Sequence, residues 1–177
     1  NECARVSRCQ DYEVTQLELP TERSVEQALL LGPDRYLLTT SNGIFFELSQ
    51  GQLSERNDLQ GLPPVNVKQQ GETFYFGGLN GEIQRGRLGG PFEDISLPEN
   101  IFVLEVQPSP FTDEVLALAA DDNVDEDLRV WLRRDEQRTK LAQLTVGDTS
   151  VSQSEVGWLA PKRAVMAYGG SRALQLL

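Results

Sequence analysis

The stretch RYLLTTSNGIFFEL, residues 35–48, holds two apolar runs of strand length joined by Ser-Asn-Gly. Asn-Gly is the pair that best tolerates the positive φ angles of a type I′ hairpin turn. The stretch TFYFGGLNGEIQRGRL, residues 73–88, has the same arrangement, and its turn glycine Gly81 follows Gly43 by 38 residues. We therefore expect two antiparallel hairpins of one design at a regular interval.

Two further hairpins are predicted along the chain, at residues 114–132 and 164–177. Aligning Gly43, Gly81, Asp127 and Arg172 gives spacings of 38, 46 and 45 residues. Another candidate strand precedes each hairpin, at 25–31, 65–69, 101–106 and 156–160, and a further extended piece follows the first three, at 52–55, 92–97 and 141–146. The sequence thus predicts a unit of four strands that repeats about every 40 residues.

Only residues 125–144 offer a helical alternative, because many of them are good helix formers. Leu128, Val130 and Leu132 alternate with a period of two, which is the period of a strand. We therefore predict strands here as well.

Four strands in a repeat of this length are typical of β-propeller blades. Each blade buries its apolar faces only against its neighbours. We predict an all-β chain that forms one β-propeller-like domain over residues 1–177, with four-stranded antiparallel blades at about 24–60, 61–98, 99–147 and 148–177.

Short pieces of the chain resemble WD-repeat blades. Asp127-Leu128-Arg129-Val130-Trp131 is similar to the third strand of such a blade, and residues 170–176 are a second example. The resemblance is distant, because the chain has no Gly-His pair and Leu132 follows Trp131 where the family has Asp. It implies a propeller without the hydrogen-bond network that those residues supply.

The fourth unit ends after its third strand, so the closure of the ring needs an explanation. Residues 1–20 form an N-terminal tail with an extended stretch at 13–19, which we expect to serve as a closing strand. Closure removes unpaired sheet edges. Two arrangements remain open: a compact four-bladed ring, or part of a larger propeller, which we favour because four blades is the rare end of the range.

The overall charge restricts the class of partner. The chain of 177 residues has 16 basic and 27 acidic residues, a net charge of −11. Such a chain repels the phosphates of nucleic acids and anionic membranes, and it has no apolar run long enough for membrane insertion. We expect no nucleic acid partner and favour a protein partner with a basic or mixed surface, although the acidity also serves solubility.

The chain contains no histidine, which excludes His-dependent catalytic dyads and ordinary zinc sites. Its two cysteines, Cys3 and Cys9, are close enough in sequence to form a small disulfide-closed ring. Together with a first residue that is not Met, this pair favours an exported protein, periplasmic or extracellular. Two unrelated free thiols are the alternative.

The acidic stretch DDNVDED, residues 121–127, places Asp121, Asn123, Asp125 and Asp127 at alternate positions. This spacing suits oxygen ligands around calcium. Glu126 stands where a helix-loop-helix calcium loop requires Gly, and Leu132 stands where it requires a bidentate Glu. An acidic, solvated hairpin loop is therefore the simpler interpretation, and calcium is the alternative.

Phe111 is the aromatic residue that we expect outside the strands, since Pro108 and Pro110 place it on a loop. Phe111 and the nearby Asp113 are candidate partner-binding residues, because exposed loop aromatics often anchor interfaces. The alternative is that the ring packs under its own loop.

Two functions are compatible with these features. The first is a non-catalytic protein-interaction or ligand-binding propeller module, favoured because no catalytic motif is present. The second is a calcium-dependent propeller hydrolase, lactonase-like or glycan-cleaving, with carboxylates from the acidic loop, Glu105 or Glu155 in a central channel. We expect a protein that is not an enzyme and that needs no cofactor.

Calcium binding at residues 121–127 has a direct test. If the loop binds calcium, millimolar calcium raises the melting temperature and a chelator lowers it, because a ligand that binds only the folded state stabilises that state. Scanning calorimetry with calcium, with magnesium and with chelator measures the effect. An unchanged melting temperature contradicts the calcium-dependent hydrolase.

Overall fold

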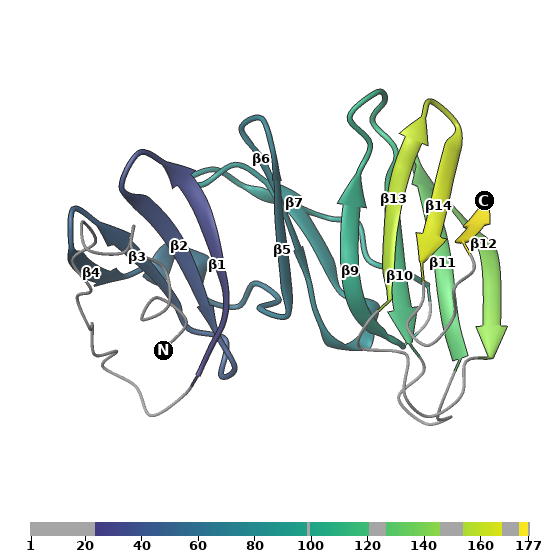
Figure 1. Cartoon of the computed structure of the whole chain (residues 1–177). Helices are drawn as coiled ribbons and strands as arrows, with labels where there is room; N and C mark the ends of the chain where they lie inside the picture. Colours follow the sequence, from purple (N-terminus) through teal and green to yellow (C-terminus); the bar gives the residue numbers. More distant parts are fainter. Residues whose placement is uncertain (1–23, 99, 121–126, 146–153, 168–173, 177) are drawn as a thin grey trace, which may run out of the picture.

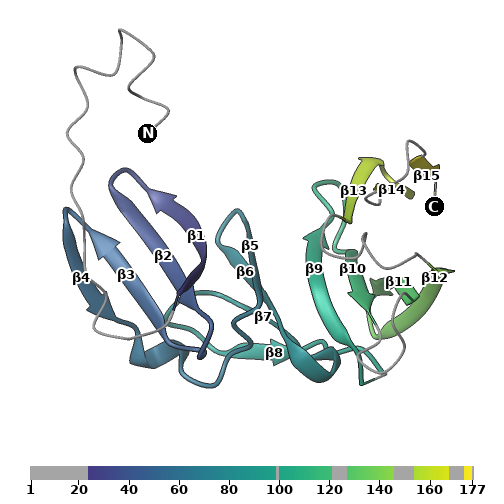
Figure 2. The same cartoon turned by 60° about the horizontal axis from the view of Figure 1, so that its bottom comes forward.

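The computed structural model describes residues 24–98, 100–120, 127–145, 154–167 and 174–176. The chain is all-β and forms four antiparallel sheets, each from strands that are consecutive in the sequence. The sheets follow one another around an open arc, with sheet 1 at one end and sheet 4 at the other (Figures 1 and 2). This radial arrangement confirms the predicted β-propeller architecture with four blades.

The strands of each sheet lie side by side in chain order. Sheet 1 contains β1 (Val25–Gly32), β2 (Arg35–Thr40), β3 (Phe45–Ser49) and β4 (Gln52–Glu55). Sheet 2 contains β5 (Asn66–Gln70), β6 (Thr73–Gly77), β7 (Ile83–Gly86) and β8 (Phe92–Asp94). Sheet 3 contains β9 (Phe102–Pro108), β10 (Val115–Ala120), β11 (Asp127–Arg134) and β12 (Gln137–Thr145), and sheet 4 contains β13 (Glu155–Ala160), β14 (Arg163–Ala167) and β15 (Leu174–Leu176).

The second strands of the two middle sheets, β6 and β10, are buried on both faces, as strands covered on both sides require. In β10, sequence VLALAA, alternate side chains point to opposite faces, yet the first five are all buried. Val115, Ala117 and Ala119 pack with sheet 2, whereas Leu116 and Leu118 pack with sheet 4. A continuous apolar run therefore marks a sheet held between two neighbours.

Aromatic side chains fill the core between sheets 1 and 2. The ring of Phe76, which is fully buried, contacts Phe45 edge-on at 5.6 Å between centroids and Phe92 edge-on at 5.4 Å. Leu37, Leu59 and Val67 complete this core. Edge-to-face aromatic pairs contribute about 0.5–1.5 kcal/mol beyond the area that they bury.

A polar side chain on each of the first three innermost strands hydrogen-bonds to the backbone of the next innermost strand. Gln27 on β1 accepts from Val67 N and donates to Val67 O, both at 2.8 Å. Asn66 on β5 accepts from Val106 N at 3.0 Å, and Glu105 on β9 accepts from Val156 N at 3.0 Å. We call Gln27, Asn66 and Glu105 the clasp residues. They satisfy backbone N–H groups that have no ladder partner, because the innermost strand of each sheet is an edge strand.

The Asn-Gly turns have different geometries. At Leu79–Glu82, Asn80 and Gly81 have φ of 59° and 76°, and Glu82 N donates to Leu79 O at 3.1 Å, which confirms the predicted type I′ turn. The prediction for residues 41–43 was wrong. There only Gly43 has a positive φ, of 80°, and Gly43 N donates to Thr40 O at 3.0 Å, so Ser41 and Asn42 are the central residues of the turn. The buried Thr40 hydroxyl accepts from Ile44 N at 3.1 Å and closes this turn.

Residues 127–145 form the antiparallel pair β11–β12, so the strand prediction for this region is confirmed. The stretch from Asp127 to Trp131 lies on the third strand of its sheet, as its resemblance to WD-repeat blades implies. The expected closing strand at 13–19 lies outside the described residues. Among the described strands, sheet 4 has three.

The described residues contain no helix with the length and apolar character needed to cross a bilayer.

A Cβ added at Gly77 should destabilise the packing of sheet 2 against sheet 3. It would lie 2.8 Å from Val106 Cγ2 and 3.0 Å from Val103 Cγ1, and both valines are fully buried and β-branched. We expect Gly77→Ala to lower the free energy of unfolding by about 1–3 kcal/mol, as overpacking does. Urea denaturation measures it. Gly32→Ala is the matched control, since nothing lies within 4 Å of its added Cβ, and an equal loss in both variants contradicts the tight contact between the sheets.

Candidate functional site

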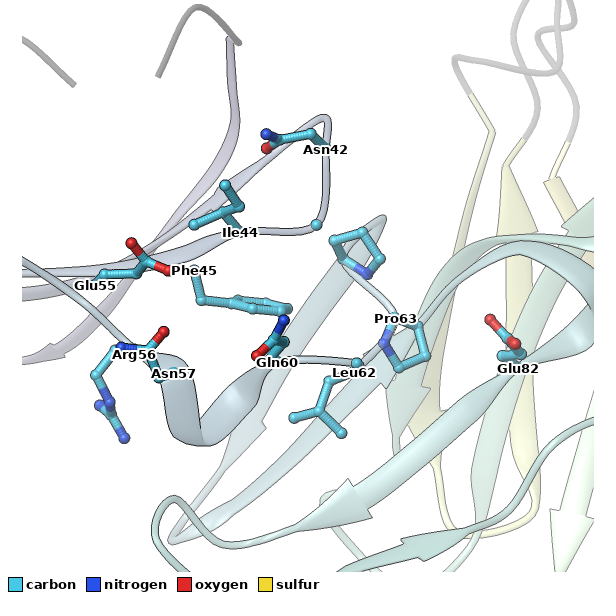
Figure 3. Close-up of a pocket in the computed structure, with 13 residues that line it drawn as sticks. Asn42, Ile44, Phe45, Glu55, Arg56, Asn57, Gln60, Leu62, Pro63 and Glu82 are labelled. Carbon is cyan, nitrogen blue, oxygen red and sulfur yellow. The ribbon is translucent and has the colours of Figure 1, made fainter. Parts of the chain in front are cut away.

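A cleft of about 480 Å³ opens between sheets 1 and 2, at the edge of the arc that lies at the bottom of Figure 1 (Figure 3). We call this edge the lower edge; the first and second strands of each sheet are joined at the opposite, upper edge. The cleft has apolar walls, side-chain amides and charged groups. The apolar residues are Ile44, Phe45, Leu62, Pro63 and Pro64, the amides are Asn42, Asn57 and Gln60, and the charged residues are Glu55, Arg56 and Glu82. We call this set the acidic cleft.

The connection between β4 and β5 forms the floor of the acidic cleft. It contains the 3₁₀ turn η3 (Asn57–Leu59), and Leu59 is fully buried in the core between sheets 1 and 2. Gln60 N donates to Asn57 O at 3.2 Å, and Leu62 N donates to Leu59 O at 3.1 Å. Leu59 therefore fixes a compact loop whose Asn57 and Gln60 side chains are exposed.

The positive charge of Arg56 is neutralised by two carboxylates, those of Asp58 and Glu47. Its guanidinium binds Asp58 through two nitrogens at 2.8 and 2.7 Å and binds Glu47 Oε2 at 2.6 Å. Glu47 also pairs with Arg35 at 2.7 Å. Burial alone would raise the pKa of Glu47, but hydrogen bonds and charge from Arg35 and Arg56 outweigh it, so the pKa lies below its ordinary value.

Glu55 and Glu82 supply the negative charge of the acidic cleft. Both side chains are exposed, and neither forms an ion pair with any residue that the structure describes. Glu55 comes from the end of β4 and Glu82 from the turn before β7, so they lie at opposite ends of the cleft (Figure 3). Two unneutralised carboxylates flanking an apolar surface favour a cationic ligand with an apolar portion.

A second cavity, of about 580 Å³, lies toward the upper edge and includes the predicted partner-binding residue Asp113. Its Glu93 binds Arg85 at 2.5 Å and Arg133 at 3.0 Å. The hydrogen bond from Arg85, followed by the charges of both arginines, places the pKa of Glu93 below its ordinary value. The Glu93 carboxylate in this cavity is thus neutralised by the two arginines that it binds.

Phe111 lies on the connection between β9 and β10, also at the upper edge. Its ring is 49% exposed, so it does not pack fully under its own loop. The fully buried Ser109 accepts from Phe111 N and Thr112 N, both at 3.2 Å, and fixes the loop. The structure therefore brings Phe111 and Asp113 to one edge and the acidic cleft to the other.

Other predicted site residues are described only in part. Asp121, Asn123 and Asp125 lie outside the described residues, as do Cys3 and Cys9. Asp127 begins β11 and accepts a hydrogen bond from Gln143 at 2.8 Å. Within the described part of the chain, no group of three or more Cys, Asp or Glu residues is placed to hold a metal ion.

Glu105 and Glu155, considered as carboxylates of a central channel, lie on the innermost strands β9 and β13. Glu105 is occupied as a clasp residue and by an ion pair with Lys68 at 3.2 Å. Glu155 is exposed on the last sheet. The Glu105 carboxylate thus lies against the backbone of Val156, the residue after Glu155, and is already occupied there.

Sequence reasoning missed the acidic cleft. Glu55 and Glu82 are 27 positions apart and each looks like an ordinary surface acid beside a turn. Their places in the predicted blades could have indicated the cleft. Glu55 ends the last strand of one predicted blade, and Glu82 follows the Asn-Gly turn of the next. In a propeller these two connections meet at the same edge.

No family model matches the chain, and no curated protein matches it. Among solved structures, it is similar to the computationally designed Ika4 protein at 14% identity, with a TM-score of 0.52 over 94% of this chain and 97% of that chain. It is similar to YCF48 in a structure with bound D1 peptide (15% identity, TM-score 0.54, 95% of this chain and 57% of that chain) and to the N-terminal domain of Nup159 (13%, 0.52, 89% and 50%). The chain thus spans about half the length of the last two chains. At these identities the similarities establish the β-propeller fold and nothing finer.

The Glu47 ion pairs should make stability depend on pH in the acid range. Because the folded-state pKa of Glu47 is lowered from 4.5, its carboxylate stabilises the fold above pH 4.5, and this contribution is lost as pH falls through the folded-state pKa. We expect Glu47→Gln to lower the free energy of unfolding by roughly 1–3 kcal/mol at pH 7 and by progressively less below pH 4.5.

Urea denaturation of both proteins between pH 7 and pH 3 measures this dependence. Glu72→Gln is the control, because Glu72 pairs with Arg87 through side chains that are 80% and 72% exposed, and such pairs contribute little. A deficit of Glu47→Gln that is the same at every pH would contradict the ionic origin.

Proposed function

We propose that the protein is a non-catalytic protein-interaction module whose acidic cleft binds an extended basic segment of a partner protein. The observation that carries the proposal is the pair of unneutralised carboxylates, Glu55 and Glu82, at the two ends of an apolar cleft lined with amides. Apolar walls hold the non-polar part of a peptide, and convergent polar groups fix its orientation.

The groups in the cleft match the groups of a peptide. The side chains of Asn57 and Gln60 are exposed there and can donate to and accept from a peptide backbone. The half-buried Ile44, Leu62 and Pro64 offer apolar contact for the stem of a lysine or arginine. Glu55 and Glu82 then meet the charged ends of such side chains.

The net charge of the chain acts in the same direction. At −11, the protein attracts basic segments over a distance of about one Debye length and repels acidic ones. The similar propeller YCF48 was solved with a bound peptide, which supports peptide recognition as a function that this fold allows. Phe111 and Asp113, on the upper edge, are a second proposed contact surface for the same class of partner.

The acidic cleft can be tested with an array of immobilised octapeptides of random sequence. We expect the bound peptides to be enriched in Lys and Arg. A labelled octapeptide taken from that set should bind the Glu55→Gln/Glu82→Gln double variant at least tenfold more weakly, since hydrogen bonds to charged groups contribute about 1.5–3 kcal/mol. Its affinity for the unaltered protein should fall as NaCl rises.

Glu72→Gln is the matched control, because it removes an exposed acid on the upper edge and leaves the cleft unchanged. Phe111→Ala tests the second surface. An array without a basic preference, or equal weakening by Glu72→Gln, would refute binding in the acidic cleft. Loss of binding in Phe111→Ala alone would move the site to the upper edge.

A further inference from the structure

The outer face of sheet 1, the face turned away from sheet 2, is apolar but is covered by none of the described sheets. Two cross-strand rows run across it, because their members are register partners on adjacent strands. One row is Leu30, Tyr36, Leu48 and Leu53, and the other is Ala28, Leu38, Phe46 and Glu55. Phe46 is buried within the chain, whereas Ala28 and Glu55 are exposed. Leu30 is 58% exposed and Tyr36 is 38% exposed. A sheet face that met only water would carry polar residues at these positions.

The outer face of sheet 4 is apolar in the same way. Gly157 and Val165 are register partners on this face, and Ala167 follows Val165 on the same side. Leu159 lies near the turn between β13 and β14, at a shift in the register between Trp158 and Ala160, and is 58% exposed. Leu30 and Leu159 therefore hold corresponding positions: each is on the innermost strand, close to its turn, at one end of the arc.

The hydrogen-bond pattern of the clasp residues between neighbouring sheets extends to both ends of the arc. Each valine that donates to a clasp residue directly follows another polar residue of the same strand: Asn66-Val67, Glu105-Val106 and Glu155-Val156. Glu155 thus holds the clasp position of β13, yet its side chain is exposed and has no hydrogen-bond partner among the described residues. At the other end, Ala28 directly follows the clasp residue Gln27 and is exposed. It holds the position of the valines whose N–H groups donate to the clasp residues.

We propose that a second copy of this chain covers both end faces. Sheet 4 of each copy packs against sheet 1 of the other, so that two arcs close into one ring with two equivalent seams. In each seam Leu159 meets Leu30, and Glu155 accepts from the backbone N–H of Ala28, as Glu105 accepts from Val156 N within the chain.

Two observations favour a second copy over closure of the chain on itself. Sheets 1 and 4 lie at opposite ends of the arc, separated by sheets 2 and 3 (Figure 2). The two faces complement each other. Sheet 4 supplies the acceptor, the Glu155 carboxylate, and sheet 1 supplies the donor position, the backbone N–H of Ala28.

The oligomeric state of the purified chain tests the proposal. Light scattering coupled to size exclusion should give twice 19.7 kDa at micromolar concentrations. Leu30→Arg and Leu159→Glu should each dimerise at least tenfold more weakly, because each places an unpaired charge in both seams. Leu141→Arg, at a leucine that is 40% exposed on β12 of sheet 3, should leave the mass unchanged.

Mixing the two variants distinguishes this ring from a dimer that uses one face twice. In a mixed ring one seam pairs the arginine introduced at position 30 with the glutamate introduced at position 159, and the other seam is unaltered. We therefore expect an equimolar mixture to recover the dimer. A dimer built from two copies of the sheet 1 face would be lost in Leu30→Arg, kept in Leu159→Glu and not recovered by mixing.

The hydrogen bond of Glu155 has its own pair of variants. Glu155→Ala should weaken the dimer, whereas Glu155→Gln should retain it, because an amide oxygen can accept from the backbone as Gln27 does. A monomeric chain at 100 μM, roughly the upper limit for a specific weak dimer, overturns the proposal, and so does a mass of three or more copies. Circular dichroism confirms that each variant folds. The Glu82→Gln single variant leaves the face of sheet 1 unaltered, so it should weaken peptide binding and remain dimeric. Peptide binding and ring closure can therefore fail independently.

Discussion

A sheet with two apolar faces has to be covered on both sides, and the arrangement of this molecule follows from that constraint. Burial of apolar surface contributes about 25 cal/mol per Å², and a single four-stranded sheet buries little of its own surface. The second strands of the middle sheets are buried on both faces because each sheet has two neighbours, as the successive buried residues of β10 show. When sheets stack around an axis, each sheet covers the faces of its neighbours, and only the two end sheets keep an uncovered face until the ring closes.

The clasp residues provide hydrogen-bond partners for backbone groups that this stacking leaves without one. Innermost strands pair with a neighbour in the sheet on one side only, so their other backbone groups face the axis. Gln27, Asn66 and Glu105 satisfy four of these groups from the adjacent sheet. Because a hydrogen bond demands defined geometry, each clasp also fixes how far one sheet slides along the next, which apolar packing alone does not determine.

The same seam that joins sheets 1 and 2 creates the acidic cleft. One wall is the end of sheet 1 with Glu55, and the other is the turn of sheet 2 with Glu82. The buried Leu59 and the Arg56 ion pairs hold the connection between them. The core thus positions exposed charges that no single blade could bring together, which is the general way in which propellers present loops on a rigid frame.

The sequence by itself determined the strands, their order and the propeller class, because local alternation and turn residues repeat at a regular interval and depend only on neighbours in the chain. It also predicted an exposed Phe111, since prolines restrict the loop locally. The turn at residues 41–44 differed because the Thr40 hydroxyl, which the tertiary structure buries, accepts from Ile44 N across the turn. Only the tertiary structure decided that Glu55 and Glu82 share a cleft, that Glu105 is a clasp, and that apolar end faces remain. Those facts depend on which sheets meet, and distances between sheets are not encoded in the spacing of residues along one strand.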